Sequence, residues 1–266
     1  TALMRQSIKL YNWSDLHLEK NELNHHDLFN KLNLNRRFIN ILTLTGDIST
    51  PLHQSFSDFF NTASQIFDIV LYVAGNHEYH SDQLTYTEIN QLIKIKLRKY
   101  SNVYFLDNQY IRLYGYIFIG TTLWSHIPEC HFKYINSKIS DYKCITWNNR
   151  LIKPADVNQL NKEAVDFLHD VLSKYDNSCI LLTHHAPIYN SHNITVSHPK
   201  YNGSIGNCAY HNNLYSLLKT PLYMWIFGHT HYRNLFKINN VILWTNQYGY
   251  SEEITSEYDP NLHITL

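Results

Sequence analysis

Five apolar runs in this 266-residue chain each end in side chains that can bind a divalent metal ion. The residues at the five ends are Asp15 and His17; Asp47; Asn76 and His77; His184 and His185; and His229 and His231. Each run has the length and the large apolar side chains of a buried strand. Strand–helix–strand units carry functional residues at the carboxyl ends of their strands, so the pattern predicts an α/β fold with these side chains near that end.

Two of these ends have a spacing that fits a shared metal ion. Asp15 and His17 are two residues apart, as are His229 and His231, and residues i and i+2 of an extended segment point the same way. Alone, an Asp-x-His or Gly-Asp sequence is more typical of a polar turn, but five such ends in one chain are improbable by chance. The oxygen and nitrogen donors, with no thiolate, suit Mn, Fe, Zn or Ni. About seven ligands are too many for one ion, which predicts a binuclear site.

The remaining pattern predicts alternating strands and helices in a single domain, residues 1–266, because no linker, repeat or low-complexity segment interrupts it. We expect strands at residues 7–13, 40–45, 68–74, 179–183, 222–227, 235–238 and 241–244. We expect helices at residues 54–67, 81–100 and 154–175. Three short runs at 103–106, 110–113 and 116–119, separated by turn residues, predict an antiparallel meander. Residues 124–154 lack a clear periodicity and are expected to cross the face of the sheet, where they could contact substrate.

Charge and hydropathy argue against several classes of protein. The chain has 22 Lys and Arg and 22 Asp and Glu, so its net charge of zero does not predict a broad surface for nucleic acid or an anionic membrane. No apolar stretch reaches the roughly 18 residues that a membrane span needs. The four cysteines show no CxxC spacing and no signal peptide is visible, so we expect reduced thiols and a cytoplasmic protein.

The motifs, in their order along the chain, resemble those of the calcineurin-like metallophosphoesterases. The matching sequences are Asp15-x-His17, Gly46-Asp47, Gly75-Asn76-His77-Glu78, His184 and Gly228-His229-x-His231. Further sequences, Ser14-Asp-Leu-His-Leu-Glu19, Gly120-Thr-Thr-Leu-Trp124, Asp141-Tyr142 and Thr183-His-His-Ala-Pro187, are similar to those of the small predicted phosphohydrolases of that superfamily. The resemblance covers most of residues 7–250. It implies an α/β fold in which two mixed sheets form a β-sandwich flanked by helices.

The resemblance also implies a role for each motif residue. The ligands implied for one metal are Asp15, His17 and His231, and those for the other are Asn76, His184 and His229. Asp47 would bridge the two metals, and His77 would protonate the leaving-group oxygen or steady the phosphate. Two metals about 4 Å apart can share a hydroxide that attacks phosphorus in line. Alternation allows only one of His184 and His185 to face the metals; the resemblance favours His184 and leaves His185 behind it or facing substrate.

One departure from the phosphoprotein phosphatases bears on the substrate. Those enzymes carry an Arg soon after their Gly-Asp and another after Asn-His-Glu, whereas Ile48 and Tyr79 follow the corresponding motifs here. Without these arginines, a phosphomonoester dianion would be held less tightly. We therefore expect a phosphodiesterase acting on a small, nucleotide-like or cyclic nucleotide substrate. The alternatives are a phosphomonoesterase or protein phosphatase, a nuclease, which the zero net charge disfavours, and a non-catalytic scaffold. The side chains expected to contact substrate are Asn76, His80, His126, Tyr142, His185 and Asn207.

Overall fold

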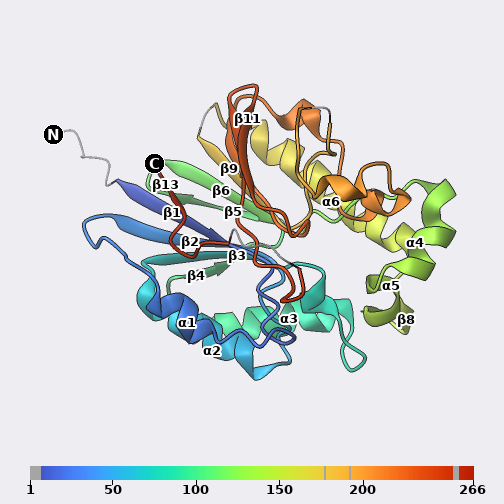
Figure 1. Cartoon of the computed structure of the whole chain (residues 1–266), viewed down its shortest axis with the longest axis horizontal. Helices are drawn as coiled ribbons and strands as arrows, with labels where there is room; N and C mark the ends of the chain where they lie inside the picture. The colour runs from blue at the N-terminus through green and yellow to red at the C-terminus, as the bar shows by residue number, and fades with distance from the viewer. Residues whose placement is uncertain (1–6, 177, 192, 254–257) are drawn as a thin grey trace.

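The long strands bury both of their faces, which explains their almost continuously apolar sequences. In β1 (Ile8–Trp13), Ile8 and Leu10 face one core, whereas Tyr11 and Trp13 face another. The computed structural model describes residues 7–176, 178–191, 193–253 and 258–266. Two sheets lie face to face around the first of these cores, and helices cover their outer faces (Figure 1). This is the predicted β-sandwich of two mixed sheets flanked by helices.

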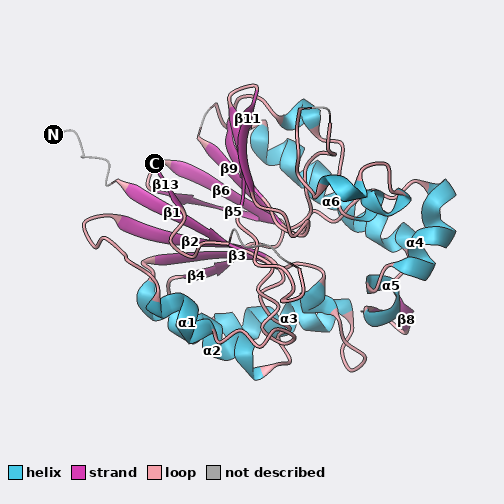
Figure 2. Ribbon diagram, viewed as in Figure 1, coloured by secondary structure: helices cyan, strands magenta, loops and turns pink. Residues whose placement is uncertain are grey.

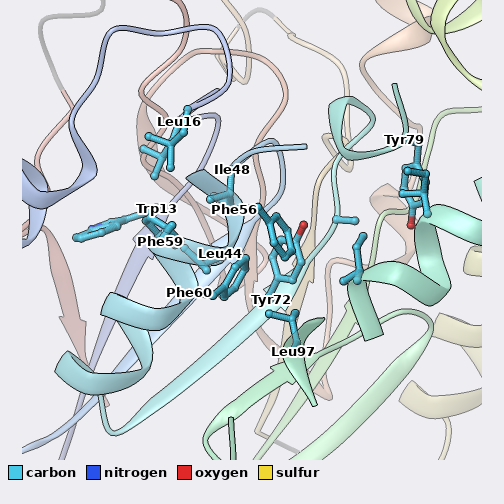
Figure 3. Packing of buried hydrophobic residues seen from close by; sticks show 14 of the residues in the cluster. Trp13, Leu16, Leu44, Ile48, Phe56, Phe59, Phe60, Tyr72, Tyr79 and Leu97 are labelled. Atoms are coloured by element: carbon cyan, nitrogen blue, oxygen red, sulfur yellow. The ribbon is translucent and has the colours of Figure 1, made fainter. Parts of the chain in front are cut away.

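The first sheet has the strand order β13-β1-β2-β3-β4. Its members are β1, β2 (Ile39–Thr45), β3 (Ile69–Val73), β4 (Val103–Phe105) and β13 (His263–Thr265). β1 to β4 are parallel, and β13 is antiparallel to β1. The outer face carries α1 (His25–Asn30), α2 (Gln54–Ile66) and α3 (Tyr86–Leu97). Aromatic side chains of α2 belong to the core: Phe59 packs on Trp13 and Phe60 on Tyr72 (Figure 3).

The second sheet has the strand order β11-β12-β10-β9-β6-β5, seen beside the first in Figure 2. Its members are β5 (Gln109–Leu113), β6 (Tyr116–Thr121), β9 (Cys179–Thr183), β10 (Leu222–Ile226), β11 (Asn234–Ile238) and β12 (Val241–Thr245). The four central strands are parallel and the two edge strands antiparallel. The helix α6 (Pro154–Leu172) covers its outer face. Cys179 is buried, and all four cysteines are unpaired.

The predicted meander at 103–119 is wrong in its first strand. β4 pairs in parallel with β3 in the first sheet, and the chain then crosses to the second sheet, where β5 and β6 form the expected hairpin. The turn at Asp107-Asn108 marks where the strand ends but not which other strand it pairs with. Strand pairing depends on contacts between residues that are distant in sequence. The helix expected from residue 81 begins only at Tyr86, since the Thr85 side chain caps it and Glu88 completes the capping box.

Residues 124–154 contain only short elements in place of a long helix or strand. They comprise α4 (Phe132–Lys138), α5 (Asp141–Cys144) and the two-stranded ribbon of β7 (Thr146–Trp147) and β8 (Arg150–Leu151). α5 places Asp141 beside the strand ends of the first sheet. Among the described residues, no helix combines the length and the apolar character that crossing a membrane requires.

The start of α6 offers a test of stability against pH. Asp156 accepts the Lys153 backbone N–H at 2.8 Å and two hydrogen bonds from the Arg150 guanidinium, which lower the pKa of this carboxyl. Because the pKa of Asp156 is lower in the folded protein than in the unfolded chain, the ionised carboxylate stabilises the fold at pH values above the ordinary pKa. This stabilisation is lost as the pH falls through the pKa of the folded protein. We expect Asp156→Asn to lower the free energy of unfolding by about 1 kcal/mol near pH 7.

The measurement is urea unfolding at a series of pH values down to the acid range. Asp166→Asn is the matched control, because Asp166 forms only an exposed pair with Lys162 on the same helix. Water and salt screen such an exposed pair, so its loss should change the stability little. A difference between Asp156→Asn and the wild type that persists unchanged at low pH would contradict this account.

Candidate metal centre

The side chains predicted to bind metal follow five parallel strands, three from the first sheet and two from the second. Each group follows directly on the carboxyl end of its strand: β1, β2 and β3 in one sheet, and β9 and β10 in the other. The bond from the Gly228 N–H to the His184 carbonyl and that from the Asp15 N–H to the Gly46 carbonyl link neighbouring ends. The backbone N–H of His229, after β10, also donates to Asp15, after β1, so the strand ends of the two sheets meet at this site.

The backbone is strained at five of these residues. Left-handed φ angles occur at Asp15 (55°), His17 (45°), Asp47 (54°), His229 (69°) and His231 (47°). Residues other than glycine seldom adopt this region, and each instance costs on the order of 1–3 kcal/mol. Strain of this kind gathers at functional sites, where the surrounding structure holds it in place. The sharp turn re-aims each side chain as the strand ends.

One group of donors consists of Asp15, His17 and His231. The Nε2 atoms of His17 and His231 lie 3.1 Å apart, and His231 Nε2 is 3.3 Å from Asp15 Oδ1. Glu253 lies 2.5 Å from the other nitrogen of His231. Burial alone would lower the pKa of His231, but the hydrogen bonds to Asp15 and Glu253 outweigh it and raise the pKa to about 10. The surroundings of this imidazole thus favour positive charge, as a cation site requires.

The second group consists of Asn76, His184 and His229. His184 Nε2 lies 2.9 Å from Asn76 Oδ1 and 3.1 Å from His229 Nδ1. His184 Nδ1 is 2.7 Å from the Thr45 carbonyl, which can only accept, so Nδ1 carries a hydrogen and, in the neutral ring, Nε2 presents a lone pair. The Asn76 amide nitrogen donates to Asp141 at 2.7 Å, which leaves its oxygen directed at His184. The assignment of the Asn76 oxygen thus follows from its neighbours.

Asp47 lies between the two groups. Its Oδ2 is 3.7 Å from His17 Nε2 and 3.5 Å from His184 Nε2, whereas its Oδ1 accepts the His77 backbone N–H at 2.9 Å. One carboxylate oxygen therefore faces both groups, the position that a bridging ligand would need. Within the described residues, three clusters could hold a metal ion: Asp15, His17 and His231; Asp47, His184 and His229; and His17, Glu19 and His77.

Two bound divalent cations would satisfy these side chains better than hydrogen bonds among the side chains themselves can. The Asn76 oxygen and the Asp47 Oδ2 atom lie 2.9 and 3.5 Å from His184 Nε2. Burial alone would lower the pKa of His184, but the charge of Asp47 outweighs it and raises the pKa to about 9, so these surroundings favour positive charge. Cations placed among such lone pairs would satisfy them all. Glu253, Asp141 and the Thr45 carbonyl hold the ligands from behind, as the outer partners of metal ligands do.

Glu78 fastens the loops that carry these ligands. Its fully buried carboxylate accepts the backbone N–H groups of Asp47, Ile48 and Gly75 at 2.8–2.9 Å. Burial, followed by the charge of Asp47, raises the pKa of Glu78 to about 8. A Cβ on Gly75 would lie 2.7 Å from the Asp47 nitrogen, so this close approach of the loops after β2 and β3 requires glycine. Sequence reasoning quoted Glu78 within a motif but gave it no role.

A cavity of about 300 Å³ opens beside the two groups of donors. Asp47, Asn76, His229 and His231 lie on its wall together with His77. The other lining residues are Ile139, Ser140, Ser197, Tyr201, Ser204, Gly206, Asn207, Tyr210, His211, Thr230, Tyr250 and Glu253. Within the described part of the chain, this lining contains no Lys or Arg. The volume suits a small molecule rather than a folded partner.

The residues expected to contact substrate have different locations. Asn207 lines the cavity. His80 lies behind it, 2.7 Å from Asp141, and His185 is buried with its ring 4.2 Å from that of His229. Burial, then the charge of His184, lowers the pKa of His185 to about 3, so it is neutral. The structure thus brings His184 rather than His185 into the donor group.

Two of the expected contacts lie elsewhere. Tyr142 is packed in the apolar core around α2 and α3, and the exposed His126 lies outside the residues that line the cavity. Both residues lie in the segment 124–154, which has no clear periodicity. Its sequence therefore does not indicate which of its side chains reach the strand ends. Conversely, sequence reasoning missed Tyr250 and Glu253, which reach the site from a segment without any recognisable motif.

An α/β sandwich with two adjoining His and Asp clusters at its strand ends is the architecture of a binuclear metal-dependent hydrolase. A model of the calcineurin-like phosphoesterase family matches residues 8–233. The chain is 37% identical over 270 residues to uncharacterized protein L509 of Acanthamoeba polyphaga mimivirus, covering 95% of each. Its fold is similar to that of phosphopantetheinyl hydrolase (PptH) from Mycobacterium tuberculosis, with a TM-score of 0.75, 14% identity, and 98% and 97% of the two chains covered.

The chain therefore belongs to the calcineurin-like phosphoesterase family, and it is a metal-dependent phosphoesterase. The predicted fold class and enzyme class are confirmed.

Glu253 provides a test of the first group of donors. Because its carboxylate holds His231 from the side away from the other ligands, Glu253→Gln should weaken metal retention by roughly 10–100-fold without changing the fold. The measurement is the metal content per chain after dialysis against graded chelator concentrations. Glu252→Gln is the matched control, an exposed neighbouring carboxylate that should leave metal content unchanged. Equal metal retention by both variants would show that Glu253 does not support the site.

Proposed function

We propose that the protein is a phosphodiesterase acting on small, nucleotide-like phosphate esters, cyclic nucleotides among them. The observation that carries the proposal is the composition of the cavity: its described lining has tyrosines and neutral polar groups beside the metal ligands, but no Lys or Arg. A phosphodiester carries one negative charge and a phosphomonoester nearly two at neutral pH. A site without lining arginines therefore suits the diester better.

The tyrosines support a substrate with an aromatic or ring-shaped part. Tyr201, Tyr210 and Tyr250 all line the cavity, and the ring of Tyr210 stacks on His229 with centroids 4.6 Å apart. Aromatic side chains provide flat surfaces on which a nucleobase can stack. The amide of Asn207 and the hydroxyls of Ser197 and Ser204 would supply hydrogen bonds to the rest of the substrate. The small cavity disfavours a long polymer, so we do not expect a general nuclease.

In this proposal Asp15, His17 and His231 hold one cation, Asn76, His184 and His229 hold the other, and Asp47 contacts both. When bound, two such cations supply a nucleophilic water of lowered pKa and neutralise charge on the phosphate. Mn, Fe, Zn and Ni all match the oxygen and nitrogen donors. His77 lies next to this site and lines the cavity, so it is placed to donate a proton to the leaving-group oxygen. The tyrosines and the lining hydroxyls orient the ester.

The test compares bis-p-nitrophenyl phosphate with p-nitrophenyl phosphate, with Mn²⁺ added and then with EDTA. We expect preferential hydrolysis of the diester, abolished by EDTA. A preference for the monoester would identify a phosphatase instead, and no turnover of either by metal-loaded protein would favour a non-catalytic scaffold or a highly selective enzyme. Cyclic nucleotides follow in the panel. A phosphopantetheinyl ester joins them, because the structurally similar PptH is a phosphopantetheinyl hydrolase.

His77→Ala tests the role of the proton donor. Loss of general acid catalysis should lower kcat by on the order of 10²–10⁴-fold on esters with poor leaving groups, while the metal content stays at the wild-type value. Metal analysis and steady-state kinetics on one preparation separate the two effects. The matched control is His169→Ala, since His169 is exposed on α6, away from the cavity. Unchanged kcat in His77→Ala would remove this residue from the mechanism.

A further inference from the structure

Both nitrogens of the His77 ring have side-chain partners. Lys20 Nζ lies 3.0 Å from Nδ1, and the Tyr250 hydroxyl lies 3.1 Å from Nε2. An ammonium group has hydrogens to donate and no lone pair to accept with. Nδ1 must therefore accept from Lys20, and the hydrogen of the neutral ring is on Nε2, from which it donates to the Tyr250 oxygen. These contacts fix which nitrogen of His77 carries the hydrogen.

Lys20 is anchored to the segment that carries Tyr250. The neighbouring Asn21 donates to the Leu16 carbonyl at 2.8 Å and to the Gly249 carbonyl at 2.9 Å, and it accepts from the backbone of Ser251. Its backbone N–H also bonds to the His17 carbonyl. The loop after β1 and the segment at residues 249–251 are thus joined by one side chain.

Tyr250 completes this arrangement. Its ring stacks on His17 with centroids 4.5 Å apart, and Lys20 Nζ lies over the same ring at 5.5 Å, within the range of a cation–π contact. Tyr250 and His77 both line the cavity, so the Nε2 side of the imidazole adjoins the space available to substrate. Tyr250 lies beyond residue 233, where the match to the family model ends, and Lys20 follows the motif that ends at Glu19.

We infer that Lys20 is a positioning residue that holds His77 with its hydrogen on Nε2 and supplies the proton that replaces it. The inference rests on the proposed function, in which His77 protonates the leaving group. As the bond between phosphorus and the leaving oxygen breaks, its electron pair stays on that oxygen, which takes the Nε2 proton. Nδ1 takes a proton from the Lys20 ammonium in the same step, so the imidazole stays neutral. After the leaving group departs, Nε2 takes a proton from solvent water and Nδ1 returns its proton to the Lys20 amine, which restores the starting state.

A simpler role for Lys20 would be to attract the phosphate by its charge. The two roles differ in how they depend on the leaving group. Proton donation matters most when the departing oxygen is a poor leaving group and matters little for the stable p-nitrophenolate anion. Charge attraction would act on every phosphodiester alike and would appear in KM. Comparing diesters that differ only in the leaving group therefore separates the two roles.

The experiment measures kcat and KM for p-nitrophenyl phenyl phosphate and diphenyl phosphate with metal-loaded protein. We expect Lys20→Met to lower kcat on diphenyl phosphate by about tenfold or more and on the p-nitrophenyl ester by less than about twofold, a fraction of the general acid effect. Lys20→Arg keeps donor hydrogens and should recover part of the loss. Lys162→Met is the matched control, an exposed lysine on α6. An equal loss on both esters confined to KM, or no loss at all, would overturn the inference.

Two further measurements separate this inference from the function on which it rests. His77→Ala must itself show the leaving-group dependence; if it does not, His77 is not the acid and the proposed mechanism fails first. If it does and Lys20→Met does not, only the role of Lys20 fails. Independently of activity, the ¹⁵N chemical shifts of the His77 ring in metal-free protein should show the hydrogen on Nε2. Lys20→Met should mix the two tautomers, and an unchanged tautomer would overturn the inference.

Discussion

Packing between the two sheets sets where every candidate ligand lies, because the ligands come from strand ends of both. Leu10 and Ile41 of the first sheet share a fully buried core with Ile180, Met224 and other residues of the second. A strand that slipped by one residue would turn its side chains to the opposite face. The described residues of this core carry no acidic, basic or nucleophilic side chain. The core nevertheless determines the distances between the metal ligands.

The backbone is strained at the strand ends that carry the candidate ligands. His17 and Asp47 both have left-handed φ angles, and a backbone hydrogen bond of 2.9 Å from the His17 nitrogen to the Asp47 carbonyl joins them. The carboxylate of Glu78 adds three backbone hydrogen bonds to the same loops. Such bonds offset the unfavourable dihedral angles and leave the side chains with little freedom. The ligands are therefore held in place by the chain itself.

Electrostatics at the site separate into two zones. Around Asp47 the buried groups present lone pairs and negative charge, which favours cations. At the edge, Lys20 brings a positive charge to His77 and the ring of Tyr250. The Lys20 ammonium group lies 3.0 Å from His77 Nδ1. His77 is not a metal ligand in our assignment, and this contact orients its ring. The surroundings of His77 thus differ from those of the candidate ligand histidines.

Much of the fold and of the centre followed from local sequence. The strand at residues 179–183 was predicted with its observed bounds, and candidate ligands were placed after it and after four other strands, because apolar runs and i, i+2 spacing are short-range patterns. β4 was assigned to the wrong neighbour, since strand pairing is a long-range property. Nothing near Tyr250 in sequence indicates that it would contact His77, which lies 173 positions away.

The sequence by itself determined the strands, the donor types and the family. Only the tertiary structure decided that Asn76 turns its oxygen inward because Asp141 takes its amide nitrogen, and that Lys20 and Tyr250 share His77. The physical reason is that a periodic pattern specifies which face of an element is buried. The hydrogen bonds that orient a side chain depend on atoms from distant segments, which meet only after the sheets have packed.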